Sequence, residues 1–153
     1  SRRLALPEAS VEEILTSPPY GVTLDYIEND AHAFRALGYS TDRIRENFVG
    51  LRGNVQHRLE LFVEDIRQCY AEMYRVLRPG RWCVIIIGNG TVGSEETDLI
   101  DLTIRMCRNI GFEFVREIEK PIRGRRNEMS RESIIMLIKS STVKERNPAS
   151  MDL

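Results

Sequence analysis

The feature that most constrains this chain is the sequence Thr-Ser-Pro-Pro-Tyr at residues 16–20, which directly follows the apolar but partly acidic stretch 11–15. Two consecutive prolines fix two φ angles and remove two backbone donors, and each disfavours a helical conformation for the residue before it. The sequence therefore predicts a short strand over 11–16 that ends in a rigid, extended turn. Such a turn can hold a flat ring against Tyr20 while carbonyl groups left unpaired by the prolines face the amine of that ring. This arrangement indicates a site for chemistry on a planar base.

The Ser-Pro-Pro-Tyr sequence after an apolar strand resembles the catalytic motif of the S-adenosylmethionine-dependent amino-methyltransferases of DNA. These enzymes methylate the exocyclic amine of cytosine or adenine, and the serine form of the motif is more typical of the cytosine enzymes. The resemblance extends over residues 4–139. Its supporting matches are Leu24-Asp25-Tyr26, Leu37-Gly38, Phe48-Val49-Gly50 with Arg52, and Val76-Leu77-Arg78-Pro79-Gly80 followed by the apolar run 82–88.

The resemblance implies roles for individual residues. Ser17, Pro18, Pro19 and Tyr20 are the expected catalytic residues: the Ser17 hydroxyl and the Pro18 carbonyl would hold the amine, and Tyr20 would stack on a base flipped out of the duplex. S-adenosylmethionine is the implied cofactor and DNA the implied partner.

The same resemblance assigns further residues to the cofactor site. Thr16, Asp25 and Tyr26 are expected there. For Asp25 and Tyr26, an ordinary role at the start of a helix stays an equal alternative.

Periodicity predicts the remaining elements. Residues 28–37 form a helix that ends at Gly38, Ser40 caps a second helix over 41–48, and 50–54 is a loop. A long helix over 55–77 has one apolar face, and the run 82–87 is a strand buried on both faces. A helix over 95–110 ends at Gly111, and strands over 112–119 and 132–139 flank a basic loop.

Alternation of strands and helices predicts an α/β fold with a mostly parallel sheet. The final strand follows a loop and not a helix, so it is expected to pair antiparallel. The resemblance implies the second half of the Rossmann-like class I methyltransferase sheet, whose last strand is inserted antiparallel. Residues 1–139 are the expected catalytic domain, and the tail 140–153 has no pattern.

One part of such an enzyme is missing from the sequence. Class I methyltransferases hold their cofactor with a glycine-rich turn and an acidic residue in their first half, and this chain has only Gly88-Asn89-Gly90 with Gly93. Gly88 and Asn89 are therefore candidate cofactor residues, although Asn89 could equally be a turn residue. We expect the chain to be the C-terminal, catalytic half, partnered by an N-terminal cofactor-binding half or chain.

Composition limits the alternatives. The net charge of −1 gives no overall basic field, so DNA contact would depend on a local patch such as Arg123, Arg125, Arg126 and Arg131, which could also be a solvated loop. Three cysteines lie in apolar segments without metal-ligand spacing, which favours a cytoplasmic protein with reduced thiols and no metal. No apolar run reaches membrane-spanning length. An RNA base-amine methyltransferase and a non-catalytic nucleic-acid-binding partner subunit stay as alternatives.

Overall fold

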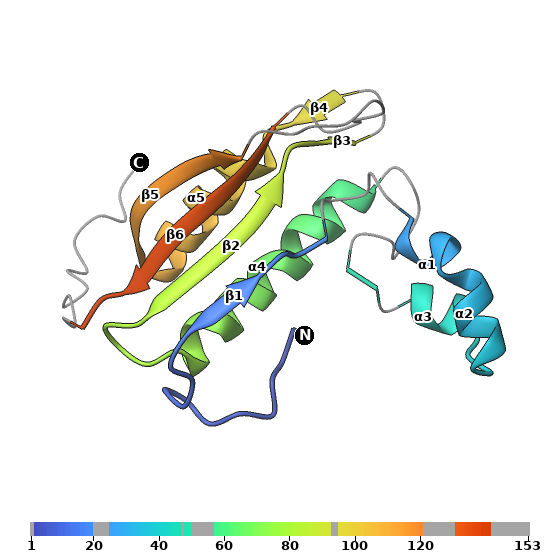
Figure 1. Ribbon diagram of the computed structural model, residues 1–153, viewed down its shortest axis with the longest axis horizontal. Helices are drawn as coiled ribbons and strands as arrows, with labels where there is room; N and C mark the ends of the chain where they lie inside the picture. Colours follow the sequence, from blue (N-terminus) through green and yellow to red (C-terminus); the bar gives the residue numbers. More distant parts are fainter. Residues whose placement is uncertain are drawn as a thin grey trace.

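The computed structural model describes residues 2–19, 25–46, 48–49, 57–92, 95–120 and 131–141 (Figure 1). Strands and helices alternate along the chain in the order expected of an α/β protein. The elements are β1 (Ile14–Thr16), α1 (Tyr26–Asn29), α2 (Ala31–Ala36), α3 (Thr41–Arg45), α4 (Arg58–Val76), β2 (Trp82–Gly88), β3 (Gly90–Val92), β4 (Glu95–Thr97), α5 (Leu99–Ile110), β5 (Phe112–Lys120) and β6 (Glu132–Lys139).

The main sheet has four strands in the order β1-β2-β6-β5. β1 and β2 are parallel and are joined through α4, as a parallel pair requires a crossover. β6 is inserted between β2 and β5 and runs antiparallel to both. This confirms the predicted α/β fold with one antiparallel C-terminal strand. β1 is shorter than predicted, because Val11 forms only an isolated bridge to Leu77.

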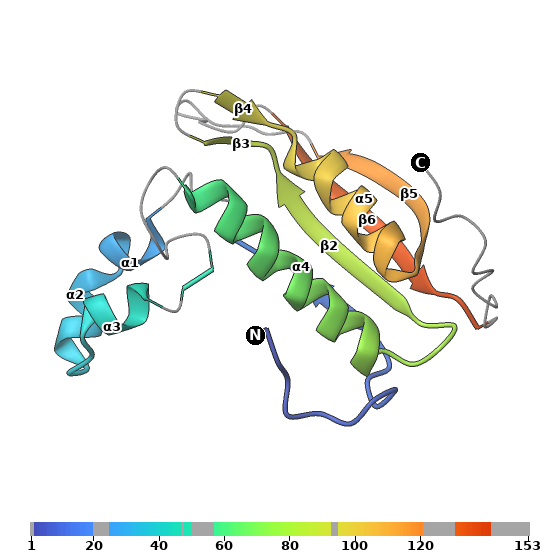
Figure 2. The same ribbon diagram turned by 180° about the vertical axis from the view of Figure 1, so that it is seen from behind.

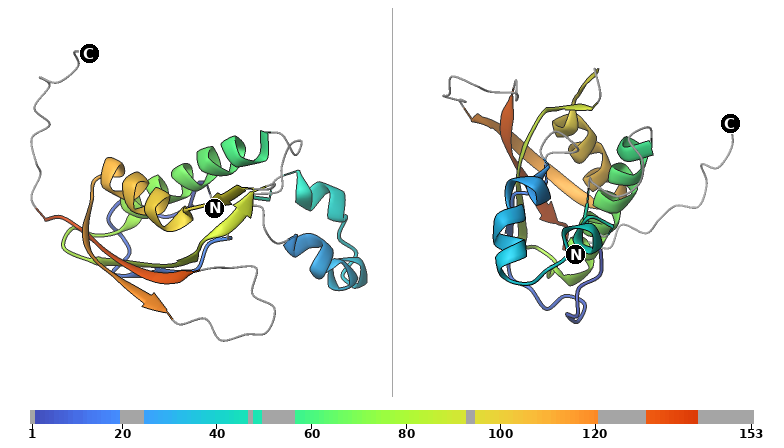
Figure 3. Two further views of the ribbon diagram at one scale, coloured as in Figure 1. Left: turned by 90° about the horizontal axis from the view of Figure 1, so that it is seen from above. Right: turned by 90° about the vertical axis from the view of Figure 1, so that its right-hand side faces the viewer.

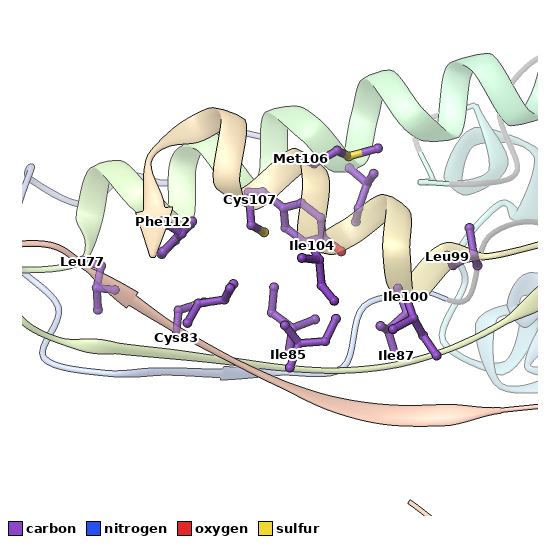
Figure 4. Packing of buried hydrophobic residues seen from close by; sticks show 14 of the residues in the cluster. Leu77, Cys83, Ile85, Ile87, Leu99, Ile100, Ile104, Met106, Cys107 and Phe112 are labelled. Carbon is purple, nitrogen blue, oxygen red and sulfur yellow. The ribbon is translucent and has the colours of Figure 1, made fainter. Parts of the chain in front are cut away.

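Helices α4 and α5 lie on the same face of this sheet (Figures 2 and 3). Side chains of alternate strand residues point at them, among them Cys83, Ile85 and Ile87 of β2. Figure 4 shows these residues packed under Ile104, Cys107 and other side chains of α5. The prediction that residues 82–87 are buried on both faces is wrong, because Trp82 is 36% exposed and Val84 and Ile86 are only half-buried. A continuous apolar run shows that both faces are apolar, but it does not show that both are covered.

Most of the predicted long helix is confirmed as α4, which ends where Leu77 adopts an extended backbone before Arg78 and Pro79. The predicted start of the next helix at residue 95 is wrong. The Asp98 carboxylate accepts a hydrogen bond from the Asp101 backbone N–H at 2.9 Å and caps α5, while Glu95–Thr97 pairs with β3. Gly111 ends α5 as predicted, with a φ of 124°.

The segment between β1 and α4 differs from its prediction. The single helix expected over 28–37 is divided at Asp30, which ends α1 and begins α2. Gly38 follows α2 with a φ of 77°, as a helix-ending glycine should. Ser40 precedes α3 but its side chain makes no capping hydrogen bond, and α3 stops at Arg45 instead of residue 48. The expected loop at 50–54, residues 121–130 of the basic loop and the tail from 142 onward lie outside the described residues.

Two of the three cysteines lie deep in the core and one lines its margin. Cys83 and Cys107 are buried and Cys69 is half-buried, and burial raises the pKa of the Cys83 thiol to about 12. Within the described ranges, no three His, Cys, Asp or Glu side chains gather as metal ligands would. No helix in this part of the chain has the length and apolar character that a membrane crossing needs.

Candidate functional site

The Ser-Pro-Pro turn (residues 17–19) leaves the carboxyl end of β1. β1 and β2 are parallel, with Thr16 opposite Ile85, so the turn and the residues Gly88 and Asn89 leave the same edge of the sheet. The carboxyl ends of parallel strands are where α/β proteins bind their ligands. The predicted catalytic turn thus lies at the edge where this class of fold places its chemistry. Tyr20 is outside the described residues.

One side of the turn opens onto an apolar cavity of about 550 Å³, which we call the edge hollow. Its walls are β1, the Ser-Pro-Pro turn and one flank of α4. The lining includes the buried Tyr70, whose hydroxyl is 3.2 Å from the Thr103 hydroxyl and whose pKa is raised by burial. The lining residues are Leu4, Ile14, Leu15, Thr16, Ser17, Pro18, Pro19, Phe48, Val49, Ile66, Cys69, Tyr70 and Met73.

The turn also lines a second cavity of about 450 Å³, which we call the aromatic hollow. Three rings line it together with the Asp30 carboxylate: Tyr26, Phe34 and Phe48. The Tyr26 and Phe48 ring centroids are 6.2 Å apart and their planes are inclined by 33°. Ser17, Pro18 and Pro19 complete its wall, so the turn lines both hollows, as does Phe48.

Asp30 and Phe34 were not among the residues that we predicted for the site. The sequence does contain aromatic residues between the turn and α4 that could have indicated this cavity. Whether they meet in one place, however, depends on how α1, α2 and the turn fold against one another. Tyr26, which we predicted for the cofactor site, lines the aromatic hollow instead of the edge hollow. Thr16, also predicted there, lines the edge hollow.

Asp25 has a clear structural role. Its carboxylate accepts a hydrogen bond from the Glu28 backbone N–H at 3.0 Å, which caps α1, and its other oxygen pairs with Arg45 at 2.5 Å. The hydrogen bond from Arg45 is the main cause that lowers the pKa of Asp25. These contacts favour the helix-start alternative for Asp25, and its cofactor role stays a prediction.

Gly88 and Asn89 are held by the backbone around them. Gly88 pairs with Glu132 in the sheet. Asn89 is 8% exposed, its side-chain oxygen accepts a hydrogen bond from the Ile100 backbone N–H at 3.4 Å, and its own N–H donates to the Arg131 carbonyl. Asn89 therefore links β2 to the start of α5, which favours its reading as a turn residue.

Arg131 is the one described member of the predicted DNA-contacting group. Its guanidinium pairs with Glu117 at 2.5 Å and lies 3.8 Å from Glu119, and Ser133 also donates to the Glu117 carboxylate. Much of its charge is therefore balanced within the protein, which favours a structural role. Arg123, Arg125 and Arg126 lie outside the described residues.

Comparison with known proteins identifies the fold. No protein-family model and no curated protein matches the sequence. Among solved structures, a protein from Thermus thermophilus named as a DNA modification methylase, complexed with S-adenosyl-L-methionine, matches at 22% identity and a TM-score of 0.55. PvuII DNA methyltransferase, which is cytosine-N4-specific, matches at 14% identity and a TM-score of 0.55. The fold is that of a methyltransferase. A methyltransferase from Methanosarcina mazei matches at 10% identity, with a TM-score of 0.53 over 91% of this chain and 64% of its own.

The chain spans about half the length of the first two methyltransferases. The match to the Thermus thermophilus protein covers 90% of this chain but 49% of that one, and the match to the PvuII enzyme covers 89% and 45%. Nearly all of this chain therefore matches these two structures, and it corresponds to about half of each of them.

Proposed function

We propose that this chain is the catalytic half of an S-adenosylmethionine-dependent DNA methyltransferase, formed by residues 1–139. It would transfer a methyl group to the exocyclic amine of a base flipped out of the duplex. The new C–N bond would form as the C–S bond of the sulfonium breaks, S-adenosylhomocysteine would leave, and the amine would lose one proton. Cytosine N4 is favoured over adenine N6 by the serine form of the motif and by the fold shared with a cytosine-N4-specific enzyme. The single observation that carries the proposal is the place of the Ser-Pro-Pro turn, at the carboxyl end of a parallel strand and in the wall of both hollows.

The aromatic hollow is the proposed place of the flipped base. Every nucleobase has a π face, and stacking on an aromatic side chain contributes about 1–3 kcal/mol per base. Tyr26, Phe34 and Phe48 offer such faces beside the turn, and the Asp30 carboxylate can accept a hydrogen bond from a base N–H. Stacking offsets part of the cost of removing the base from the duplex.

The turn itself orients the amine. An exocyclic amine is a poor nucleophile because its lone pair is delocalised into the ring. As acceptors for its two N–H groups, the Ser17 hydroxyl and the Pro18 carbonyl would draw both hydrogens toward one face of the ring. The nitrogen would then become pyramidal, and its localised lone pair would point from the other face at the methyl donor. The rigidity of two consecutive prolines keeps both acceptors in place, so orientation is provided before the base arrives.

The described residues fit the acceptor side of this reaction but only part of the cofactor side. S-adenosylmethionine supplies an electrophilic methyl group when bound. Thr16 and Ser17 give the edge hollow polar groups next to the turn, but no acidic side chain is among its described lining residues, so none there can hold a ribose. We therefore assign the binding of the adenosine part to the N-terminal half, which completes the proposal of a divided enzyme.

The test is methyl transfer from radiolabelled S-adenosylmethionine to duplex DNA, by the chain together with a cofactor-binding half, with the product identified by mass spectrometry of nucleosides. Ser17→Ala should lower kcat about 100-fold, because the amine loses one of its two orienting acceptors. Ser10→Ala is the matched control. The Ser10 hydroxyl donates a hydrogen bond to the Pro7 carbonyl, and the residue lies before β1. Full activity of the Ser17 variant, or methylation of RNA alone, would contradict the proposal.

A further inference from the structure

The turn between α2 and α3 exposes two large side chains to solvent. Leu37 is 71% exposed and Tyr39 is 60% exposed, and they lie on either side of Gly38. Figures 1 and 2 show α1, α2 and α3 beyond the end of the sheet at which β1 and β2 end. The two side chains, which we call the tip, therefore lie at the same end of the molecule as the Ser-Pro-Pro turn.

The backbone of the tip is held in one conformation by hydrogen bonds. The Tyr39 N–H donates to the Phe34 carbonyl at 2.9 Å, and the Gly38 N–H donates to the Arg35 carbonyl at 3.1 Å. Together with the φ of 77° at Gly38, these bonds form the Schellman motif that ends a helix. Side chains presented by a fixed backbone lose less conformational freedom when they contact a partner.

The tip adjoins the aromatic hollow through Phe34. The ring of Phe34 lines this hollow, and Leu37 is three residues further along the chain, so the two side chains are neighbours on the surface of α2. Tyr39 is joined to Phe34 by the backbone hydrogen bond described above. A base that enters the hollow leaves a gap in the duplex next to its own sugar. The tip lies about one helical turn from the wall of the hollow and is close to that gap.

Positive charge flanks the tip. Residues 31–45 contain three arginines and a single acidic residue, Asp42. Arg45 pairs with Asp25, while Arg35 and Arg43 are exposed. A duplex presents phosphates on its surface and apolar base faces in its interior. Exposed arginines beside exposed apolar side chains match both parts, which favours DNA over a protein as the partner of this surface.

We propose that Leu37 and Tyr39 form a wedge that enters the duplex at the place left by the target base, while Arg35 and Arg43 contact the neighbouring phosphates. The inference rests on the proposed function, and it names the part of the protein that acts on base stacking. Removal of a base exposes the faces of its former neighbours to water, and apolar side chains inserted between base steps cover these faces. The aromatic hollow holds the extruded base while the tip occupies its former place, so both stabilise the same opened DNA.

The first experiment measures binding to a duplex that already has a gap. The full chain is titrated by fluorescence anisotropy into a labelled duplex that lacks one base and into the same duplex with that base present. The natural sequence should bind the gapped duplex at least about tenfold more tightly, because its bases no longer have to be unstacked. Leu37→Ala combined with Tyr39→Ser should lose this preference.

Controls separate the wedge from a folding defect. Val115→Ala removes a side chain that is 44% exposed on β5, at the opposite end of the sheet from β1, and should keep the preference. Tyr39→Phe keeps the ring and should keep it as well, and the thermal melting of the double variant should match that of the natural sequence. Absence of DNA binding, equal binding of both duplexes by the natural sequence, or a preference that the double variant retains overturns the proposal.

The second experiment tests the phosphate contacts. Arg35→Gln combined with Arg43→Gln should reduce the slope of log binding constant against log salt concentration by about 1.8, because each phosphate contact accounts for about 0.9. Arg105→Gln is the control, since Arg105 pairs with Asp101 on α5 at 3.0 Å and is 65% exposed. An unchanged slope in the double variant overturns the assignment of these arginines to phosphates.

Methyl transfer separates this proposal from the proposed function. It is measured with the chain and a cofactor-binding half, on duplex DNA and on the same DNA after denaturation. The double variant at Leu37 and Tyr39 should lower transfer to the duplex at least about tenfold more than transfer to denatured DNA, which has no stack to open. Loss of the binding preference in this variant, without methyl transfer to either DNA by the natural sequence, keeps the wedge and refutes the function. Transfer that the variant lowers equally on both, or on neither, keeps the function and refutes the wedge.

Discussion

Lys139 provides a stability prediction that the structure makes quantitative. It is the last residue of β6 and is only 8% exposed, and its ammonium group donates hydrogen bonds of 2.8 Å to the carbonyls of Tyr74 and Leu77. These carbonyls belong to the end of α4, where the helix offers no further N–H partners and where its dipole favours a positive charge. The ammonium also lies 4.6 Å from the centre of the Tyr74 ring. Lys139 therefore joins the final strand to the end of the longest helix.

Lys139→Met keeps the apolar stem and removes the charge and both donors. A hydrogen bond from a charged group contributes about 1.5–3 kcal/mol, so the two together give an upper limit of about 3–6 kcal/mol. Part of this is offset, because burial disfavours the charged amine, as the lowered pKa of Lys139 indicates, and because the methionine packs well. We expect the free energy of unfolding to fall by about 2–4 kcal/mol.

The measurement is equilibrium urea unfolding followed by circular dichroism, with the midpoint compared at a constant slope. Lys120→Met is the matched control: Lys120 is on the adjacent strand β5 and pairs with Glu132 at 2.5 Å, but its side chain is 52% exposed. Exposed ion pairs contribute about 0–1 kcal/mol, so the control should change little. Equal losses for the two variants, or a loss below about 1 kcal/mol for Lys139→Met, would refute the assignment of Lys139 as the cap of α4.

Two further predictions concern the turn after α5 and the acid response of α4. Gly111→Ala should destabilise the chain by about 1–3 kcal/mol in thermal or urea unfolding, because its φ is +124° and the added Cβ would lie 3.0 Å from the Tyr74 hydroxyl. Gly38→Ala is the control and should cost less, because its added Cβ would have no atom within 4 Å. Equal losses for the two variants would contradict this prediction. The hydrogen bond from Arg75 lowers the pKa of Glu72 from 4.5 to about 2, so the stabilisation from this carboxylate is complete above about pH 4.5 and is lost as the pH falls toward 2. An ordinary pKa for the Glu72 carboxyl in an NMR titration would contradict this prediction. Glu72→Gln should remove this part of the dependence of stability on pH.

The sequence predicted best those elements whose signals are local. The periodic apolar face of α4, the stop at Arg78 and Pro79, and the glycine after α5 depend on residues within one or two turns of each other, and the structure confirms all three. The predicted start of α5 was wrong because the N-cap hydrogen bond is made by Asp98, to the Asp101 N–H, and helix periodicity alone does not locate a cap.

The candidate site likewise has one part that depends on local sequence signals and one part that does not. The Ser-Pro-Pro turn could be found from the sequence because two prolines after an apolar strand restrict the backbone locally. The aromatic hollow could not, because Phe34 and Phe48 reach it from separate segments whose packing is a long-range property. Asp25 was a candidate cofactor residue by resemblance and Asn89 by its place in a glycine-containing turn, and each had a structural role as an equal alternative. In the structure both side chains accept a hydrogen bond from a backbone N–H in the first turn of a helix.

The prediction that β2 is buried on both faces was wrong for a physical reason. A strand buried on one face normally alternates apolar and polar residues, whereas residues 82–87 are apolar throughout, and their partners Ile134, Met136 and Ile138 on β6 are apolar as well. Six apolar side chains in three opposed pairs have no function on a solvent-facing sheet and cost solubility. An apolar run in a strand therefore reports the composition of both faces of a sheet, whereas the coverage of each face depends on where the helices pack. Helices α4 and α5 both pack on the face of Cys83, Ile85 and Ile87, which is why Val84 and Ile86 are only half-buried.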